Sequence, residues 1–295
     1  MSQETLFSGE IPNLDMIAAA LQCEPSEVGL LLKVVGPGRK AFINGWQWPG
    51  VGDLAVCPDW VPLATTWQGE YGDGYSLSSI GNGLHGSLWG EGALFETYFR
   101  EDAISLVCAV SMRQKVTLPN EIKVPRAWVL FEGRREKAAQ YLLDHSPKGW
   151  IPKVIGQRYD TENALHMDGG HLCVLKGGPK STLSGRRHSV LVGGNGSTLR
   201  SSGDYSTLVA GSHSYLRGQH ESHLTAGPFS FLEAGTNCVM TAGVGSIMRA
   251  GKGSKLSWVS SETTTTIYTS YTHYQHSGFW VQETEGSKPL PLPNS

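Results

Sequence analysis

The residues of this sequence that could perform chemistry are few and widely separated. The 295 residues include five cysteines, which are far apart and odd in number: Cys23, Cys57, Cys108, Cys173 and Cys238. No two of them have the short spacing of a zinc site, and their distribution favours reduced thiols in a cytoplasmic compartment over a disulfide framework. The sequence therefore predicts neither a metal nor a cofactor.

His85, in the stretch Gly83-Leu84-His85, is the one catalytic candidate. It and His145 are the only histidines among the first 160 residues, and no Ser, Cys or Asp stands at a spacing typical of a catalytic constellation. Because a lone histidine of this kind is more often structural, the sequence favours a protein without enzymatic activity. An enzyme with its site in the head near His85 is one alternative.

Side chains suited to recognition occur instead at regular spacing in the second half of the chain. Arginine and aromatic residues are enriched in the energetic centres of interfaces, and they stand here at Arg200, Tyr215, Arg217, Phe231 and Arg249. β-branched residues form flat apolar strips on strands, and they stand at Val190, Val192, Thr207, Val209, Val239 and Thr241. We predict that both sets bind a protein partner or a second copy of the chain.

The spacing of these residues comes from an eight-residue repeat, visible in "AGVGSIMRAGKGSKLSW" (Ala242 to Trp258) and continuous from Gly169 to Ser257. Position 5 of each octad is Ser or Cys, position 7 is Leu or Met, and position 2 is mostly Gly. The alternation predicts one short strand per octad, with positions 5, 7 and 1 inward and positions 6 and 8 outward. Position 2 would be the corner, where glycine allows a positive φ or a close backbone approach. Ser201, the one extra residue, is predicted to bulge outward at a corner.

A single octad cannot bury its inward side chains, so the octads must stack. Two octads would form one 16-residue coil of a two-sided β-solenoid, and a three-sided coil of three octads is the alternative. Odd-numbered octads then present one outer surface, the odd face, and even-numbered octads present the other, the even face. The valines and threonines named above lie on the odd face, and the arginines and aromatic residues lie on the even face.

This repeat resembles the octapeptide repeats of bacterial ice-nucleation proteins, which pair into 16-residue coils of a β-solenoid. The resemblance covers about 30% of the chain. It implies an ice- or surface-binding protein as a further functional alternative. Ice nucleation implies long arrays with a regular outward Thr-x-Thr pattern, whereas this chain has few coils, with Lys, His, Val, Arg and Glu among its outward residues.

Residues 1–160 predict an α+β head domain. A helix is expected from Leu14, followed by a second helix that begins with Ser26 as its N-cap and runs through "SEVGLLLKVV". The spacing is similar to a helix-turn-helix, but the second helix is too apolar to read DNA. Strands are expected at 104–112 and 126–133, and a closing helix at 133–145. The solenoid domain would span 161–257, and 258–295 would form capping strands and a proline-rich tail.

Composition and charge limit the classes of partner. The 24 basic and 26 acidic residues nearly cancel, which argues against nucleic acid, although segment 169–257 carries a net charge of +6 that could attract an acidic protein. No apolar run could span a bilayer, and the N-terminus lacks a signal-peptide pattern, so we expect a cytoplasmic protein without membrane contact.

In outline, the whole chain resembles uncharacterised phage and bacterial proteins in which a Gly-Leu-His head is followed by Ala/Gly/Ser repeats. No activity follows from that resemblance. The sequence as a whole predicts a mainly β protein that acts as a non-enzymatic interaction or scaffold protein, most simply as a two-fold dimer. A phage-encoded inhibitor of a host system, acting in the host cytoplasm, is the narrower form of this prediction.

Overall fold

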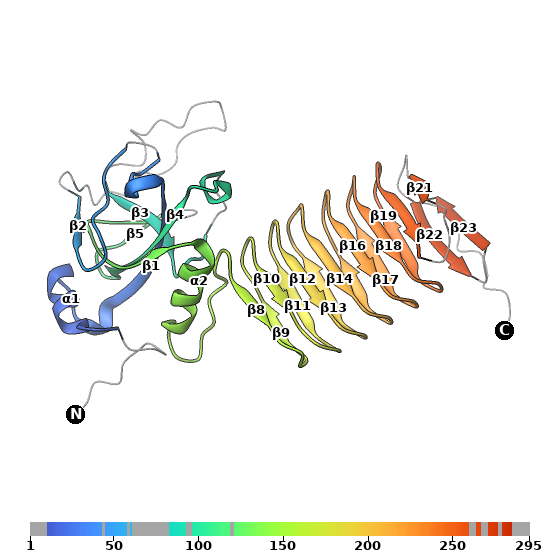
Figure 1. The fold of residues 1–295 in the computed structure, drawn as a ribbon, viewed down its shortest axis with the longest axis horizontal. Helices are drawn as coiled ribbons and strands as arrows, with labels where there is room; N and C mark the ends of the chain where they lie inside the picture. The colour runs from blue at the N-terminus through green and yellow to red at the C-terminus, as the bar shows by residue number, and fades with distance from the viewer. Residues whose placement is uncertain are drawn as a thin grey trace. The chain divides into compact units, whose positions relative to one another are not determined.

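The computed structural model describes residues 11–42, 45–57, 60, 83–92, 96–118 and 121–259, together with the backbone of three strands between 264 and 284. The chain divides into two compact units, residues 1–155 and 156–295. Figure 1 shows a mixed helix and sheet unit followed by a regular stack of short strands. The two units are described separately below.

The first unit is built on a seven-stranded antiparallel sheet with the order β2-β7-β4-β1-β3-β6-β5. Its strands are β1 (Val28–Val35), β2 (Leu54–Val56), β3 (Leu84–Leu88), β4 (Ile104–Ser111), β5 (Val116–Thr117), β6 (Ile122–Val124) and β7 (Arg126–Gly133). Its helices are α1 (Leu14–Leu21) and α2 (Arg135–Asp144), with short 3₁₀ turns at Pro25–Glu27, Pro37–Arg39 and Glu96–Phe99. The predicted first helix, the strands at 104–112 and 126–133, and the closing helix are confirmed.

The predicted second helix of the head is wrong. Ser26 lies in a single 3₁₀ turn, and the following residues form strand β1, which pairs with β4 along its whole length. All residues of β1 except Lys33 are buried. A continuous apolar run with valines at both ends suits a strand that is covered on both faces, and periodicity alone does not separate it from a buried helix. The similarity to a helix-turn-helix disappears with this helix.

The second unit is a two-sided β-solenoid. Its odd sheet contains β8 (Arg158–Asp160), β10 (Val174–Lys176), β12 (Val190–Gly193), β14 (Thr207–Ala210), β16 (His223–Ala226), β18 (Val239–Ala242), β20 (Lys255–Trp258) and β21 (Thr264–Thr266). Its even sheet contains β9 (His166–Asp168), β11 (Thr182–Gly185), β13 (Thr198–Ser201), β15 (Tyr215–Arg217), β17 (Phe231–Ala234), β19 (Ile247–Ala250), β22 (Tyr271–His276) and β23 (Phe279–Thr284). Leu175 pairs with Leu191 in parallel, 16 residues further on, which confirms the two-octad coil.

The stack extends beyond the recognisable repeat at both ends. Strands β8 and β9 form a coil before Gly169, with Tyr159 paired to Leu175 and Met167 paired to Leu183. At the other end, β21 pairs antiparallel with β20, and β22 pairs antiparallel with β19. The backbone edges of the last coil are therefore paired, as an open solenoid end requires.

The interior of the solenoid is a stack of identical rows. The position 7 side chains are fully buried: Leu175, Leu183, Leu191, Leu199, Leu208, Leu216, Leu224, Leu232, Met240, Met248 and Leu256. The position 5 serines are buried too, and their backbone N–H groups donate to the hydroxyl of the next coil, as in Ser214 N to Ser230 Oγ at 3.1 Å. These bonds satisfy polar groups that would otherwise be costly to bury.

Each corner contains two special positions. A Cβ added to Gly194, at position 2, would lie 2.6 Å from the Pro179 nitrogen of the preceding coil, so glycine is required there for close approach. The positive φ occurs at position 4 instead and is mostly adopted by other residues: Leu172, Lys180, His188, Tyr205, His213, Glu221, Phe229 and Asn237. Of the two reasons predicted for glycine at position 2, the structure selects close approach.

The expectation that Ser201 bulges outward is wrong. Ser201 pairs in register with Gly185, is 3% exposed, and its hydroxyl lies 2.7 Å from Ser206 Oγ and 2.8 Å from the carbonyl of Gly203. An added Cβ on Gly203 would meet Arg187, just as one on Gly194 would meet the coil before it. The additional residue in this corner is therefore the exposed Ser202.

Ser201 should consequently be sensitive to substitution. We expect Ser201→Ala to lower the free energy of unfolding by about 1–2 kcal/mol, because buried oxygen acceptors lose their donor. Ser202→Ala, one residue away and exposed, should change it by less than about 0.5 kcal/mol. Urea unfolding of the two variants measures the difference, and equal midpoints would show that the buried hydroxyl contributes nothing.

Candidate functional site

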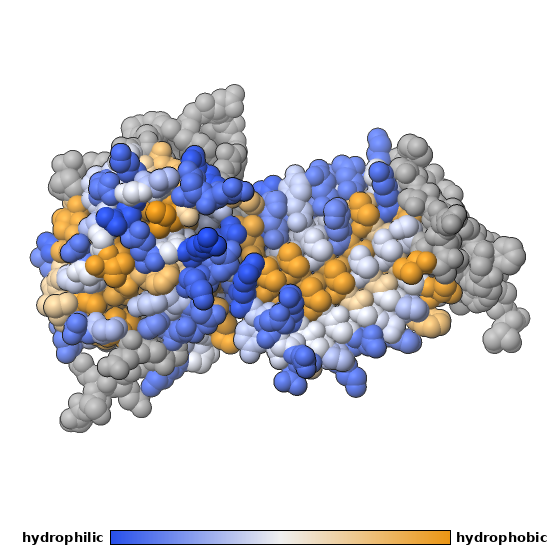
Figure 2. All heavy atoms as spheres, in the orientation of Figure 1, coloured by the Kyte–Doolittle hydropathy of each residue, from blue (hydrophilic) through white to orange (hydrophobic). Residues whose placement is uncertain are grey.

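The odd face is a flat strip of β-branched side chains on β10, β12, β14, β16, β18 and β20. Val190 pairs with Thr207, and Val192 pairs with Val209, so the predicted residues lie side by side on neighbouring strands. Val239, which is 40% exposed, and Thr241 lie two strands further on. Figure 2 shows a band of apolar side chains across this part of the solenoid.

Charged groups of the odd face lie toward its two ends. At one end, Lys176 Nζ lies 3.0 Å from the Asp160 carboxylate, and at the other Lys255 is exposed. The outward residues of β12 and β14 are uncharged valines and a threonine. His223 and Thr225 on β16 separate this apolar centre from Val239. The centre of the odd face therefore exposes apolar surface without a charge that would keep another surface away.

The even face is organised differently, because its side chains contact one another. The rings of Tyr215 and Phe231 are parallel within 1°, with centroids 5.5 Å apart. Arg200 Cζ lies 5.5 Å from the Tyr215 centroid, and Arg249 Cζ lies 5.7 Å from that of Phe231. Cation–π contacts of this kind contribute about 0.5–1 kcal/mol each at exposed sites. The predicted even-face residues thus form a continuous intramolecular ladder.

Hydrogen bonds and charge pairs strengthen the same ladder. The Tyr215 hydroxyl donates to Glu233 at 3.2 Å, and Arg217 Nε lies 3.7 Å from the same carboxylate. Tyr215, Arg217, Phe231 and Glu233 occupy paired positions on β15 and β17, so the 16-residue coil itself brings them together. Their aromatic and charged groups are already partly satisfied within one molecule.

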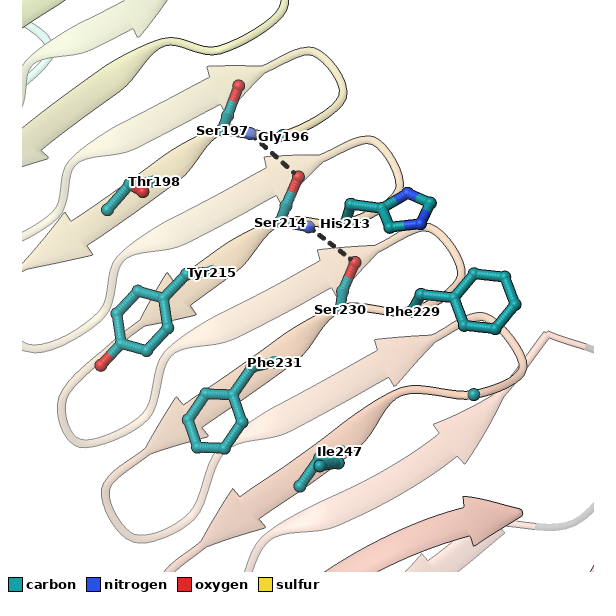
Figure 3. Close-up of a pocket in the computed structure, with 11 residues that line it drawn as sticks. Gly196, Ser197, Thr198, His213, Ser214, Tyr215, Phe229, Ser230, Phe231 and Ile247 are labelled. Carbon is teal, nitrogen blue, oxygen red and sulfur yellow. Dashed lines mark hydrogen bonds between the residues drawn. The ribbon is translucent and has the colours of Figure 1, made fainter. Parts of the chain in front are cut away.

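A groove accompanies this ladder at the corners that lead into the even strands (Figure 3). One wall carries the position 4 side chains His213 and Phe229, and the other carries the position 6 side chains Tyr215, Phe231 and Ile247. Its volume is about 380 Å³. The sequence analysis missed the groove because position 4 was treated as part of a turn; aromatic residues at that position were the available signal.

Basic side chains gather at the corners on the other edge of the solenoid. Burial, followed by the charges of Arg186, Arg187 and His188, lowers the pKa of His171 to about 4, so its imidazole is neutral near pH 7. Tyr205 stacks on His188 at 4.9 Å, and Arg187 Cζ lies 5.3 Å from the Tyr205 centroid. Part of the positive charge of the repeat therefore lies at this edge and not on the outer faces.

In the first unit, His85 has a carboxylate partner that the sequence analysis missed. His85 Nδ1 lies 3.1 Å from Glu121 Oε1, and the two side chains are 19% and 22% exposed. The pair joins β3 to the residue before β6, 36 positions away, so local spacing could not indicate it. Ser87 lies near but bonds to Tyr98, whose pKa burial raises to about 12. Among the described residues, His85 is hydrogen-bonded only to Glu121.

Two further searches of the described residues found no site. No group of three His, Cys, Asp or Glu side chains in the described part of the chain is arranged to hold a metal ion. None of the helices in the described ranges is long and apolar enough to cross a bilayer.

The fold and its outward side chains define a β-solenoid of octapeptide coils. Comparison with known proteins shows that the repeat is ice-nucleation-like, which confirms the predicted resemblance. An ice nucleation protein of Pseudomonas fluorescens is 33% identical over 106 residues, 35% of this chain and 8% of that protein. An ice nucleation protein of Xanthomonas campestris pv. translucens is 41% identical over 68 residues, 22% of this chain and 4% of the relative.

The chain thus spans less than a tenth of the length of these two relatives. No model of a known protein family matches it, and no solved structure gives a significant match.

Proposed function

We propose that the chain is a non-enzymatic scaffold protein in which the odd faces of two molecules join. The proposal rests on the contrast between the two faces. The arginines and aromatic residues of the even face contact one another, whereas Val192, Val209 and their neighbours expose an uncharged apolar strip. Exposed apolar strips of this kind mark contact surfaces on soluble proteins.

The size of the strip predicts a weak association. Five to six strands at about 4.8 Å give a length of roughly 25 Å, and a strand face is about 10–15 Å wide, so the strip offers roughly 300 Å². A standard interface buries about 800 Å² on each partner. A two-fold dimer through the odd face is therefore in exchange with its monomer, and its axis passes near Val192 and Val209, at the apolar centre.

Charges placed on both valines should separate the dimer. In the variant Val192→Glu with Val209→Glu, carboxylates would oppose each other across the axis, and we expect the dissociation constant to rise at least about 100-fold. Sedimentation velocity over a series of concentrations measures it. The matched control is Thr182→Glu with Thr198→Glu, which adds the same charges to outward positions of the even face. A parent that is monomeric at high micromolar concentration, or a control that dissociates equally, would contradict the proposal.

A narrower form of this proposal has a host protein as the partner, which a phage-encoded chain would inhibit by covering it. The support is the apolar strip together with the basic excess of the repeat. Capture from a bacterial lysate with the parent and with the Val192→Glu, Val209→Glu variant would test this form. A partner retained only by the parent is the expected result.

Ice binding is the second candidate, favoured by the names of the two relatives and by the β-branched outward rows of the odd face. A droplet-freezing assay and a thermal-hysteresis measurement test it directly. Activity that is lost in the odd-face variant and kept in the even-face control would replace the scaffold proposal. A third candidate, catalysis near His85, has the His85–Glu121 pair as its only geometric support.

A further inference from the structure

The groove of the even face has apolar walls and a fixed repeat. Phe229 is 61% exposed and Ile247 is 40% exposed, although both are large apolar side chains. His213 and Phe229 stack at 5.3 Å on one wall, and Tyr215 and Phe231 stack at 5.5 Å on the other. The rings form two parallel ridges that follow the solenoid axis (Figure 3). A ligand that fits between them is extended and runs along that axis.

The floor of the groove offers no free backbone hydrogen bonds. The N–H groups of Ser197, Ser214 and Ser230 donate to the serine hydroxyls of the next coil. Their carbonyls accept from the first residue of the next even strand, as Ser214 O does from Phe231 N at 2.8 Å. An added β-strand would find no ladder partners here. The groove instead suits a chain whose backbone makes few hydrogen bonds of its own, which describes polyproline II.

The spacing of a polyproline II helix matches that of the coils. Three residues of polyproline II advance about 9.3 Å, and two coils of the solenoid advance about 9.6 Å. Side chains at every third position of such a ligand would meet equivalent places between the ridges on alternate coils. Aromatic-lined grooves that accept proline-rich segments are a general mode of peptide recognition.

The chain itself contains a segment of this composition. Residues 288–293 read Lys-Pro-Leu-Pro-Leu-Pro and follow β23, the last strand of the even sheet. The strand order β23-β22-β19-β17 places Phe231 three strand spacings away, about 14 Å. Leu290 is six residues beyond Thr284 and can reach about 20 Å. The segment can therefore reach the groove in the same molecule.

We propose that the groove between the position 4 and position 6 side chains of the even face is a docking site for polyproline II segments, and that residues 288–293 of the same chain occupy it. The Pro and Leu side chains fill the space between Phe229 and Phe231, and the prolines bring no N–H group that needs a partner. This function is independent of the odd face, so either proposal can fail without the other.

A labelled peptide with the sequence of residues 287–295 tests the site, with fluorescence anisotropy as the measurement. The full chain is prepared with Pro289, Pro291 and Pro293 replaced by alanine, which should empty the groove. We expect the peptide to bind this variant at least about 10-fold more tightly than it binds the parent, because a tethered segment competes at millimolar effective concentration. A peptide with its three prolines replaced by alanine should not bind.

Variants of the groove walls locate the binding. In the alanine-tail background, Phe229→Ala with Phe231→Ala should reduce peptide affinity at least about 10-fold. Val190→Ala with Val192→Ala, an equal loss of apolar surface on the odd face, should leave affinity unchanged. Circular dichroism confirms that each variant keeps its strand content.

Three results would overturn the proposal. Absence of peptide binding to the alanine-tail variant, or equal binding after the phenylalanines are removed, would show that the groove does not accept this segment. Equal binding to the parent and to the alanine-tail variant would show that the segment does not occupy the groove of its own molecule.

Discussion

Leu216→Asp is expected to unfold the solenoid. Leu216 is fully buried and pairs with Leu199 on one side and with Leu232 on the other. An aspartate in this row would place a carboxylate among leucines, with no partner that could compensate its desolvation. The cost of several kcal/mol is comparable to the 5–15 kcal/mol that stabilise a whole domain. Because each coil contacts only its neighbours, damage in the middle divides the stack into two short pieces.

Two controls separate burial from other effects of this substitution. Leu216→Met keeps the volume and polarity of the side chain and should cost less than about 1.5 kcal/mol. Arg217→Asp introduces the same carboxylate one residue further on, where the side chain is 55% exposed, and should leave the solenoid folded. Thermal unfolding followed by circular dichroism compares the three variants. If Leu216→Asp keeps the parental melting temperature, the inward assignment of position 7 is wrong.

The solenoid could be predicted from the sequence because every coil states the same constraints again. A leucine or methionine at each position 7 leaves one way to form a continuous core, and the octad then places each outward residue on a face. The head offers no such repetition. Residues 28–35 are apolar throughout, so no polar side reveals their period, and only pairing with β4 decides that they form a strand.

The candidate site divides in the same way. The positions of Val192, Val209, Tyr215 and Arg217 follow from the register, which the sequence contains. What each face does depends on distances that no register specifies. The stacking of Tyr215 on Phe231 shows that the even-face residues contact one another, and it weakens the reading of them as free interface residues. The His85–Glu121 pair is a contact across the sheet, between residues whose separation in sequence carries no pattern.

Two glycines of a single corner should respond to substitution in opposite ways. A Cβ on Gly194 would meet Pro179 N at 2.6 Å, Pro179 Cα at 2.8 Å and the carbonyl carbon of Gly178 at 2.9 Å. All of these belong to the backbone of the preceding coil, which cannot rotate away as a side chain could. Gly196 has a φ of +69°, but the nearest atom to its added Cβ is Lys180 Cγ at 3.7 Å. Its constraint is conformational and not steric.

We therefore expect Gly194→Ala to lower the free energy of unfolding by about 3 kcal/mol, because the coils must separate to admit one methyl group. Gly196→Asn should cost less than about 1 kcal/mol, since asparagine tolerates the left-handed region and Asn237 already adopts a φ of +56° at the same position of another coil. Urea unfolding of both variants measures the two costs. Equal costs would mean that the corners are limited by backbone conformation alone. A large cost at Gly194 only would show that the coil spacing, which also sets the rows on both outer faces, depends on the missing side chain at position 2.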